Sequence, residues 1–226
     1  MVAALALSPG RPVSRSDLID ELWGERLPRD AENSLHGHVA RLRRIIDTRI
    51  GKDNLRDLIQ TSNRGYMLSL PEDDIDASLF CNLTRQAAAL HRTAPAHALR
   101  LLTRALALWR GTALLDTGQG LISRTAYTRL TETRLTAYEY FFDAAIRLGL
   151  HREIVAELYP LHTHHPLRER FCEQLITALY HSGRQAEALE VYHRTRRRLS
   201  EQLGIEPGDA LRAQFHRVLR REPLTV

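Results

Sequence analysis

The segment from Asn33 to Thr48 combines side chains that are suited to reading DNA. At about 100° of helical rotation per residue, four aliphatic side chains fall within about 60° of one another and form a core stripe: Leu35, Val39, Leu42 and Ile46. The opposite face carries small, polar and basic residues: Asn33, Gly37, Ala40, Arg41, Arg44 and Thr48. Small residues let a helix backbone sit deep in a major groove while guanidinium groups reach base edges. His36 and Arg43 flank this face, where phosphate contacts are expected.

The positive charge of the sequence is concentrated on this segment. The chain carries a net charge of +5, and only one of its 32 basic residues, Lys52, is a lysine. Residues 1–33 hold four arginines against six acids, whereas residues 34–49 hold four arginines against Asp47 alone. A solvated arginine-rich face is the alternative interpretation, because such faces are common on helices. The hairpin predicted after this helix favours the interpretation as a DNA-binding surface.

Residues 58–70 predict a β-hairpin that would act as a wing. Leu58–Thr61 and Tyr66–Leu70 flank the sequence Ser-Asn-Arg-Gly, in which Asn63 and Gly65 tolerate turn geometry. Arg64 would stand at the tip and lie along a DNA backbone or in a narrow minor groove, whose negative potential attracts guanidinium. Tyr66 is expected to pack back onto the domain.

These residues need elements to position them, and the N-terminal sequence supplies three helices. Met1–Leu7 predicts a short helix that ends at Ser8-Pro9-Gly10. Ser14 is a candidate N-cap for a helix over Arg15–Leu22, and Asp30 is expected to cap the third helix, which runs to about Thr48. Three helices and a C-terminal hairpin make a winged helix-turn-helix over residues 1–71.

The C-terminal part predicts a helical repeat. The acidic stretch Pro71–Asp76 indicates a domain junction, and a second domain spans residues 77–226. A shift of 34 residues places Gly149 on Gly183 and Ala144 on Ala178, which is the spacing of tetratricopeptide repeats. Amphipathic patterns predict the following helices: 77–91, 95–110, 123–148, 151–163, 167–181, 185–203 and 207–221. The fold class is therefore mainly α, with a winged helix-turn-helix followed by an all-α tetratricopeptide-like domain.

Several segments resemble known regulators. Ser34–Arg44, followed by Ile59-Gln60-Thr61 and Arg64-Gly65-Tyr66, resembles the recognition helix and wing of OmpR-type regulators, and Val13–Trp23 resembles their second helix. Four later segments resemble the bacterial transcriptional activation domain: Asp76–Phe80, Ala105–Asp116, Gly183–Leu189 and Leu203–Gly208. Both modules in this order are similar to the Streptomyces antibiotic regulatory protein (SARP) family.

The resemblance implies a function and a set of site residues. Members of the family are pathway-specific activators of secondary-metabolite gene clusters, which bind direct repeats near a promoter as side-by-side protomers and recruit RNA polymerase. The positions that match base-facing residues are Gly37, Ala40 and Arg41. The positions that match backbone-contacting or flanking residues are Ser34, Arg43 and Arg44. The positions that match the wing are Thr61 and Arg64, and Asn63 lies beside them at the turn. Double-stranded DNA, RNA polymerase and a second copy on DNA are the implied partners.

The chain departs from the family at its start. Relatives carry a small antiparallel sheet and a longer first helix, whereas this chain begins inside that helix. We therefore expect Ile59 and the hairpin edge to be partly exposed. Either the start lies upstream, or this is a shortened protein with weakened DNA binding. The second case motivates an alternative function, a truncated interaction protein that titrates a full-length regulator or RNA polymerase without binding DNA.

Other chemistry finds little support in the sequence. No Ser/His/Asp or Cys/His arrangement indicates a catalytic site, and no cofactor motif is present, so we predict no enzyme. His162–His165 is interpreted as a polar helix end before Pro166 and not as a metal site. Arg194–Arg198 is interpreted as a solvated helix face. Two distant cysteines and no apolar run of about 20 residues predict a cytoplasmic protein without a membrane partner.

Overall fold

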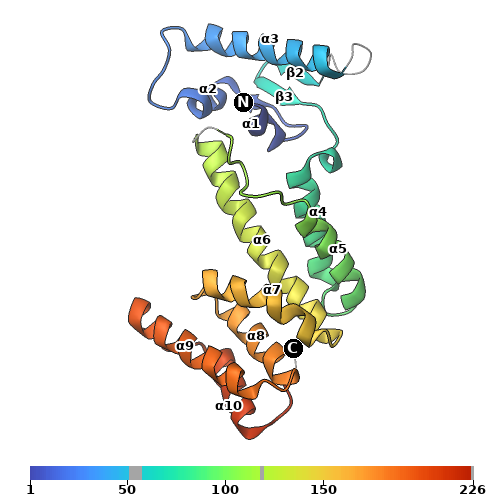
Figure 1. Cartoon of the computed structure of the whole chain (residues 1–226). Helices are drawn as coiled ribbons and strands as arrows, with labels where there is room; N and C mark the ends of the chain where they lie inside the picture. The colour runs from blue at the N-terminus through green and yellow to red at the C-terminus, as the bar shows by residue number, and fades with distance from the viewer. Residues whose placement is uncertain (51–57, 118–119, 225–226) are drawn as a thin grey trace. The chain divides into compact units, whose positions relative to one another are not determined.

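The computed structural model describes residues 1–50, 58–117 and 120–224 (Figure 1). Contacts divide the chain into two compact units, which are described separately below. The first unit comprises Met1–Leu83 and Ala105–Arg134, and the second comprises Thr84–Arg104 and Leu135–Val226. The model is a winged helix-turn-helix followed by a helical domain, so the predicted fold class is confirmed.

The winged helix contains the three predicted helices. They are α1 (Val2–Ala6), α2 (Arg15–Trp23) and α3 (Ala31–Ile50). Both predicted N-caps are confirmed: Ser14 Oγ accepts a hydrogen bond from Asp17 N at 3.0 Å, and Asp30 Oδ1 accepts one from Asn33 N at 3.0 Å. These caps satisfy backbone donors that have no partner inside the helix. They therefore set where the two helices of the helix-turn-helix begin.

The predicted hairpin is also present, and it belongs to a three-stranded antiparallel sheet. The strands are β1 (Val13–Ser14), β2 (Ile59–Ser62) and β3 (Gly65–Leu68), in the order β1-β3-β2. The sequence did not predict β1, because two residues are too short for a periodic pattern. It also placed Gly65 in the turn, whereas Gly65 lies in β3 with φ of 151° and pairs with Ser14 and Ser62. A Cβ on Gly65 would overlap the Val13 carbonyl group, so a glycine is required for β1 to approach.

The expected exposure of Ile59 was wrong. Its side chain is 2% exposed and packs in the winged-helix core with Leu35 and Val39. The physical reason is that Ile59 pairs with Leu68 and its side chain belongs to the winged-helix core, while Arg43 of α3 donates hydrogen bonds to the Ile59 carbonyl group. Gln60 and Thr61, the next residues of the edge strand β2, are exposed.

The remaining elements are helical. They are the 3-10 helix η1 (Glu72–Asp74) and the helices α4 (Asp76–Leu90), α5 (Pro95–Ala107), α6 (Leu121–Arg147), α7 (His151–His164), α8 (Glu169–His181), α9 (Gln185–Leu203) and α10 (Asp209–Arg220). The 34-residue repeat is confirmed at the helix ends. Gly149 and Gly183 have φ of 78° and 79°. Leu150 N donates to Ala145 O and Arg184 N donates to Leu179 O, so both turns close in the same way.

The second unit has its own core, to which α6, α7, α8, α9 and α10 contribute. His162 lies in this core with 1% exposure, so the interpretation of this residue as part of a polar helix end was wrong. It follows Leu158 by four residues and therefore shares the buried face of α7. His162 Nε2 lies 3.4 Å from Thr195 Oγ1, and burial lowers the pKa of His162 to about 4. The imidazole is therefore neutral at pH 7.

Candidate DNA-binding surface

Helix α3 places one face in the core and the opposite face in solvent. Leu35 and Val39 are 0% and 2% exposed, and Leu42 and Ile46 are partly buried against the same cluster. The apolar stripe predicted from the sequence is thus confirmed. The opposite face is exposed and includes His36, Gly37, Ala40, Arg41 and Arg44. Among the described residues, neither Arg41 nor Arg44 forms an ion pair or a side-chain hydrogen bond.

The first turn of α3 carries two predicted site residues that are engaged with the cap. Asn33 is exposed, and its Nδ2 donates to Asp30 Oδ2 at 2.5 Å. Ser34 is half-buried, and its Oγ donates to the Asp30 carbonyl oxygen at 2.7 Å. The carboxylate of Asp30 therefore occupies the helix N-terminus and opposes the binding of an anion there. Basic groups for phosphate lie further along α3.

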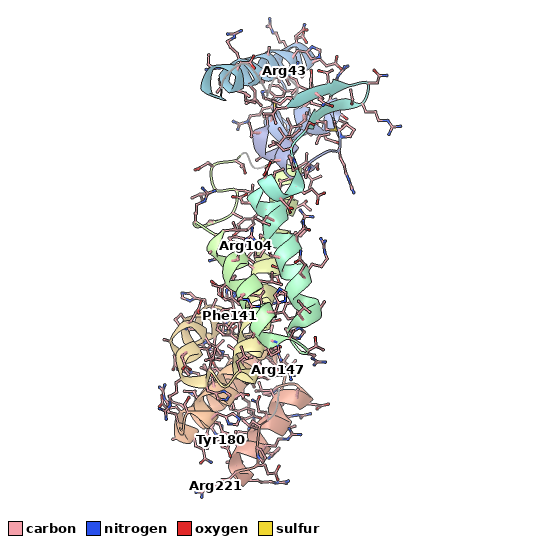
Figure 2. The ribbon with its side chains drawn as sticks, turned by 90° about the vertical axis from the view of Figure 1, so that its right-hand side faces the viewer. Arg43, Arg104, Phe141, Arg147, Tyr180 and Arg221 are labelled. Carbon is pink, nitrogen blue, oxygen red and sulfur yellow. The ribbon has the colours of Figure 1, made fainter. Side chains whose placement is uncertain are left out.

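Arg43 of α3, which Figure 2 labels, is hydrogen-bonded to the hairpin. Its Nε and Nη2 atoms donate to the Ile59 carbonyl oxygen at 3.1 and 2.6 Å, and Nη2 also donates to Thr61 Oγ1 at 2.8 Å. A planar guanidinium is suited to such a double contact, because its donors are held in a fixed fork. Arg43 therefore holds the wing at a set position beside α3, a role that the sequence analysis did not anticipate.

The wing presents its turn to solvent. Asn63 and Arg64 form the turn between β2 and β3, and both are exposed, as is Thr61. Ser62 Oγ accepts a hydrogen bond from Arg64 N at 3.2 Å and so stabilises the turn. The Arg64 guanidinium has no ion pair or hydrogen bond among the described residues. Tyr66 is 3% exposed, which confirms that it packs back onto the domain.

Two ring contacts further support α3. Trp23 of α2 lies against His38 with ring centroids 5.6 Å apart, and His36 meets the edge of Tyr66 at 6.4 Å. Sequence reasoning missed Trp23 and His38, because the contact joins two helices whose packing only the fold defines. The candidate site thus consists of α3 and of the hairpin that Arg43 holds beside it. Within the described residues, its arginines Arg41, Arg44 and Arg64 have no ion pair or side-chain hydrogen bond.

Comparison with known proteins places the whole chain in one family. A model of the transcriptional regulatory protein C-terminal domain matches residues 1–68, and a model of the bacterial transcriptional activator domain matches residues 75–219. The chain belongs to the SARP family. The transcriptional regulator RedD of Streptomyces coelicolor is 40% identical over 224 residues, which cover 99% of this chain and 64% of RedD. The regulatory protein DnrI of Streptomyces peucetius is 34% identical, and the match covers 97% of this chain and 82% of DnrI.

A solved structure agrees with this assignment. This chain superimposes with a TM-score of 0.92 on the structure of Mycobacterium tuberculosis EmbR in complex with a low-affinity phosphopeptide. The two sequences are 35% identical, and the match covers 99% of this chain and 59% of the EmbR chain. The regulatory protein AfsR of Streptomyces coelicolor is 39% identical, and the match covers 22% of its length. The chain thus spans less than two thirds of the length of RedD, AfsR and EmbR. In the described part of the chain, every helix is too short or too polar to cross a membrane.

Proposed function

We propose that this chain is a sequence-specific DNA-binding activator that regulates a secondary-metabolite gene cluster. The observation that supports this proposal is that Arg41, Arg44 and Arg64 are exposed on α3 and the wing and have no ion pair or side-chain hydrogen bond within the described residues. Partner-free guanidinium groups on a supported helix and hairpin are what recognition of a polyanion requires. Membership of a family of transcriptional regulators supports the same function.

In the proposed complex, α3 enters the major groove with its exposed face toward the bases. Gly37 and Ala40 add little bulk at the centre of this face, so the helix backbone can approach base edges. Arg41 is the candidate for a bidentate contact to guanine, and Arg44 for a phosphate contact. Asn33 and Ser34 lie in the first turn of α3, where both donate hydrogen bonds to Asp30, and with His36 they complete the candidate contacts on this helix.

The wing takes a second position on the duplex. Arg64, with Asn63 and Thr61 beside it, lies along the backbone or in the adjacent minor groove. Arg43 contributes by holding the wing, and any phosphate contact it makes would come in addition to its bonds to Ile59 and Thr61. The surface therefore combines a contact that reads sequence with contacts that position the protein.

The helical domain serves the activating step in this proposal. Two protomers bind direct repeats near a promoter in the bacterial cytoplasm, and their helical domains recruit RNA polymerase. An interaction protein that binds no DNA was the alternative, motivated by the expectation of a shortened N-terminal domain. Within the described residues, Ile59 is buried and both β1 and β2 pair with β3, which supports a formed wing.

The proposal is tested by substitution of Arg41 and Arg64. A duplex that carries the preferred tandem site is first selected from random sequence with the wild-type chain. Replacement of Arg41 by Ala should weaken binding by about 1–3 kcal/mol and relax the preference for one base pair. Arg64→Ala should weaken binding to all duplexes alike, whereas Arg100→Ala, an exposed arginine of α5, serves as the charge-matched control. Unchanged mobility shifts for Arg41→Ala and Arg64→Ala would contradict the proposal.

A further inference from the structure

Helix α2 carries a buried carboxylate, Glu21, that is not among the candidate DNA-binding residues. Glu21 is 6% exposed, although carboxylates are seldom buried without a partner. Its Oε2 atom accepts a hydrogen bond from Ile122 N at 2.8 Å, and its Oε1 atom accepts one from Ser123 N at 3.2 Å. The Ser123 hydroxyl also donates to Oε1. Three donors from a single turn thus converge on this carboxylate.

The donors belong to the first turn of α6, a helix that lies about one hundred residues further along the chain. The first amides of a helix have no acceptor within the helix, and the aligned peptide dipoles make this end positive. Helices are usually capped by a residue that directly precedes them. Here a carboxylate of the helix-turn-helix takes that place, so the start of α6 is bonded directly to the DNA-reading part.

The surrounding residues are fitted to this contact. A Cβ on Gly120 would overlap the Glu21 carboxylate and approach the Cα atom of Glu21, so only glycine allows the chain to pass at this distance. The Ile122 side chain packs against the winged-helix core, and Ser123 is 4% exposed. An apolar contact, a close backbone approach and a charge-assisted cap therefore coincide at one joint, which we call the α2–α6 joint (Glu21, Gly120, Ile122 and Ser123).

We propose that Glu21 is a positioning residue that makes the helix-turn-helix and the first half of α6 move as one body. The inference rests on the proposed function, because it assigns to the joint the task of presenting the activation domain in a defined orientation once α3 is on DNA. A fixed orientation raises the effective concentration of one protomer's helical domain for its neighbour or for polymerase. Loss of the joint would leave base reading intact and weaken the steps that depend on orientation.

The experiment compares three variants of the full chain. Glu21→Gln keeps the size of the side chain but removes its charge and one acceptor, and Gly120→Ala disrupts the joint from the other side. Asp20→Asn is the matched control, because Asp20 is exposed on the same helix and the same charge is removed. Each variant is first checked for an unchanged circular dichroism spectrum. Hydrogen exchange at Ile122 and Ser123 then reports on the joint, independently of DNA.

The expected result is a separation of readouts. In Glu21→Gln and Gly120→Ala, the Ile122 and Ser123 amides should exchange about tenfold faster than in the wild type, because a buried donor loses its acceptor. Affinity for a duplex with one half-site should stay within about twofold of that of Asp20→Asn, while cooperativity on the tandem site and run-off transcription should fall about fivefold to tenfold.

Two results would overturn the inference. One is wild-type exchange at Ile122 and Ser123 in both joint variants. The other is faster hydrogen exchange at these amides together with wild-type cooperativity and transcription, which would show that Glu21 only caps α6 locally. If the wild-type chain itself binds no duplex, the proposed function fails, and the exchange data still decide whether the joint exists.

Discussion

The arginines of α3 and the wing differ from those of α8 and α9 in what surrounds them. Arg41, Arg44 and Arg64 are exposed and unpaired within the described residues. By contrast, Arg170 binds Asp143 at 2.7 Å and Glu173 at 2.8 Å, and Arg196 binds Glu206 at 2.8 Å. The two regions are similarly rich in arginine, so the number of arginines does not define a DNA-binding surface. The proposal rests instead on arginines that lack an internal acid and that lie together on α3 and the wing.

The largest stability effect is expected where an arginine is tied to a buried acid. Asp143 is 6% exposed and accepts hydrogen bonds from Arg170 and Gln174. Asp143→Ala would leave Arg170 and Gln174 without this acceptor and should lower the free energy of unfolding by about 2–3 kcal/mol. The loss is limited because Arg170 is partly exposed and water can solvate its guanidinium group. Urea denaturation measures the change. DNA affinity of the folded fraction should not change, and a selective loss of DNA binding would contradict the comparison.

A smaller effect is expected for Arg43, the arginine of α3 that does have internal partners. Arg43→Ala should destabilise the winged helix by about 1–3 kcal/mol, because the Ile59 carbonyl and Thr61 lose a donor. Arg44→Ala, the matched control one position away, should stay within about 0.5 kcal/mol of the wild type. Thermal unfolding and hydrogen exchange of the hairpin amides measure the difference. Equal stability of the two variants would show that Arg43 does not hold the wing.

His162 provides a prediction on pH that concerns the second unit alone. Burial lowers the pKa of His162 to about 4, below the value of about 6.5 expected in the unfolded chain. Between these values the unfolded state binds more protons than the folded state, so the stability contributed at neutral pH is lost as the pH falls from about 6.5 to 4. His162→Leu should flatten this part of the pH profile, and His164→Gln, an exposed neighbour, should not. Profiles of the melting temperature with equal slopes in all three proteins would contradict the prediction.

The smallest effect is expected at the exposed ion pairs of the helical region. Arg196 and Glu206 each keep about half of their side-chain surface exposed, at 52%. The hydrogen bond from Arg196 lowers the pKa of the Glu206 carboxyl group below its ordinary value, but water screens the interaction between the two charges. Arg196→Ala should therefore leave the free energy of unfolding nearly unchanged and leave DNA binding unchanged. A large loss of DNA affinity in this variant would make α9 part of the binding surface.

The sequence predicted the elements well because their signals are local. Ser14 and Asp30 preceded their helices, and the glycines at 149 and 183 marked equivalent helix ends. The pairing of β1 with β3, the burial of Ile59 and the bonds of Arg43 depend on chain segments that are far apart in sequence. No local pattern encodes such contacts.

The candidate site was predictable to a similar extent. The exposed and buried faces of α3 followed from helical periodicity, and the structure confirms them. The roles of the individual site residues in DNA binding stay predictions. Glu21 could not be identified from its neighbours, because its partners lie at the start of α6 and only the folded chain brings them together.

The most direct test of the account is the salt dependence of DNA binding by the full chain. The dissociation constant for the selected tandem duplex is measured against salt concentration for the wild type, for an Arg44→Gln/Arg64→Gln double variant and for Arg196→Gln. The account predicts that the double variant lowers the slope of log Kd against log salt by about two, and that Arg196→Gln leaves it unchanged. A double variant with the wild-type slope and affinity would contradict the claim that these free arginines bind DNA.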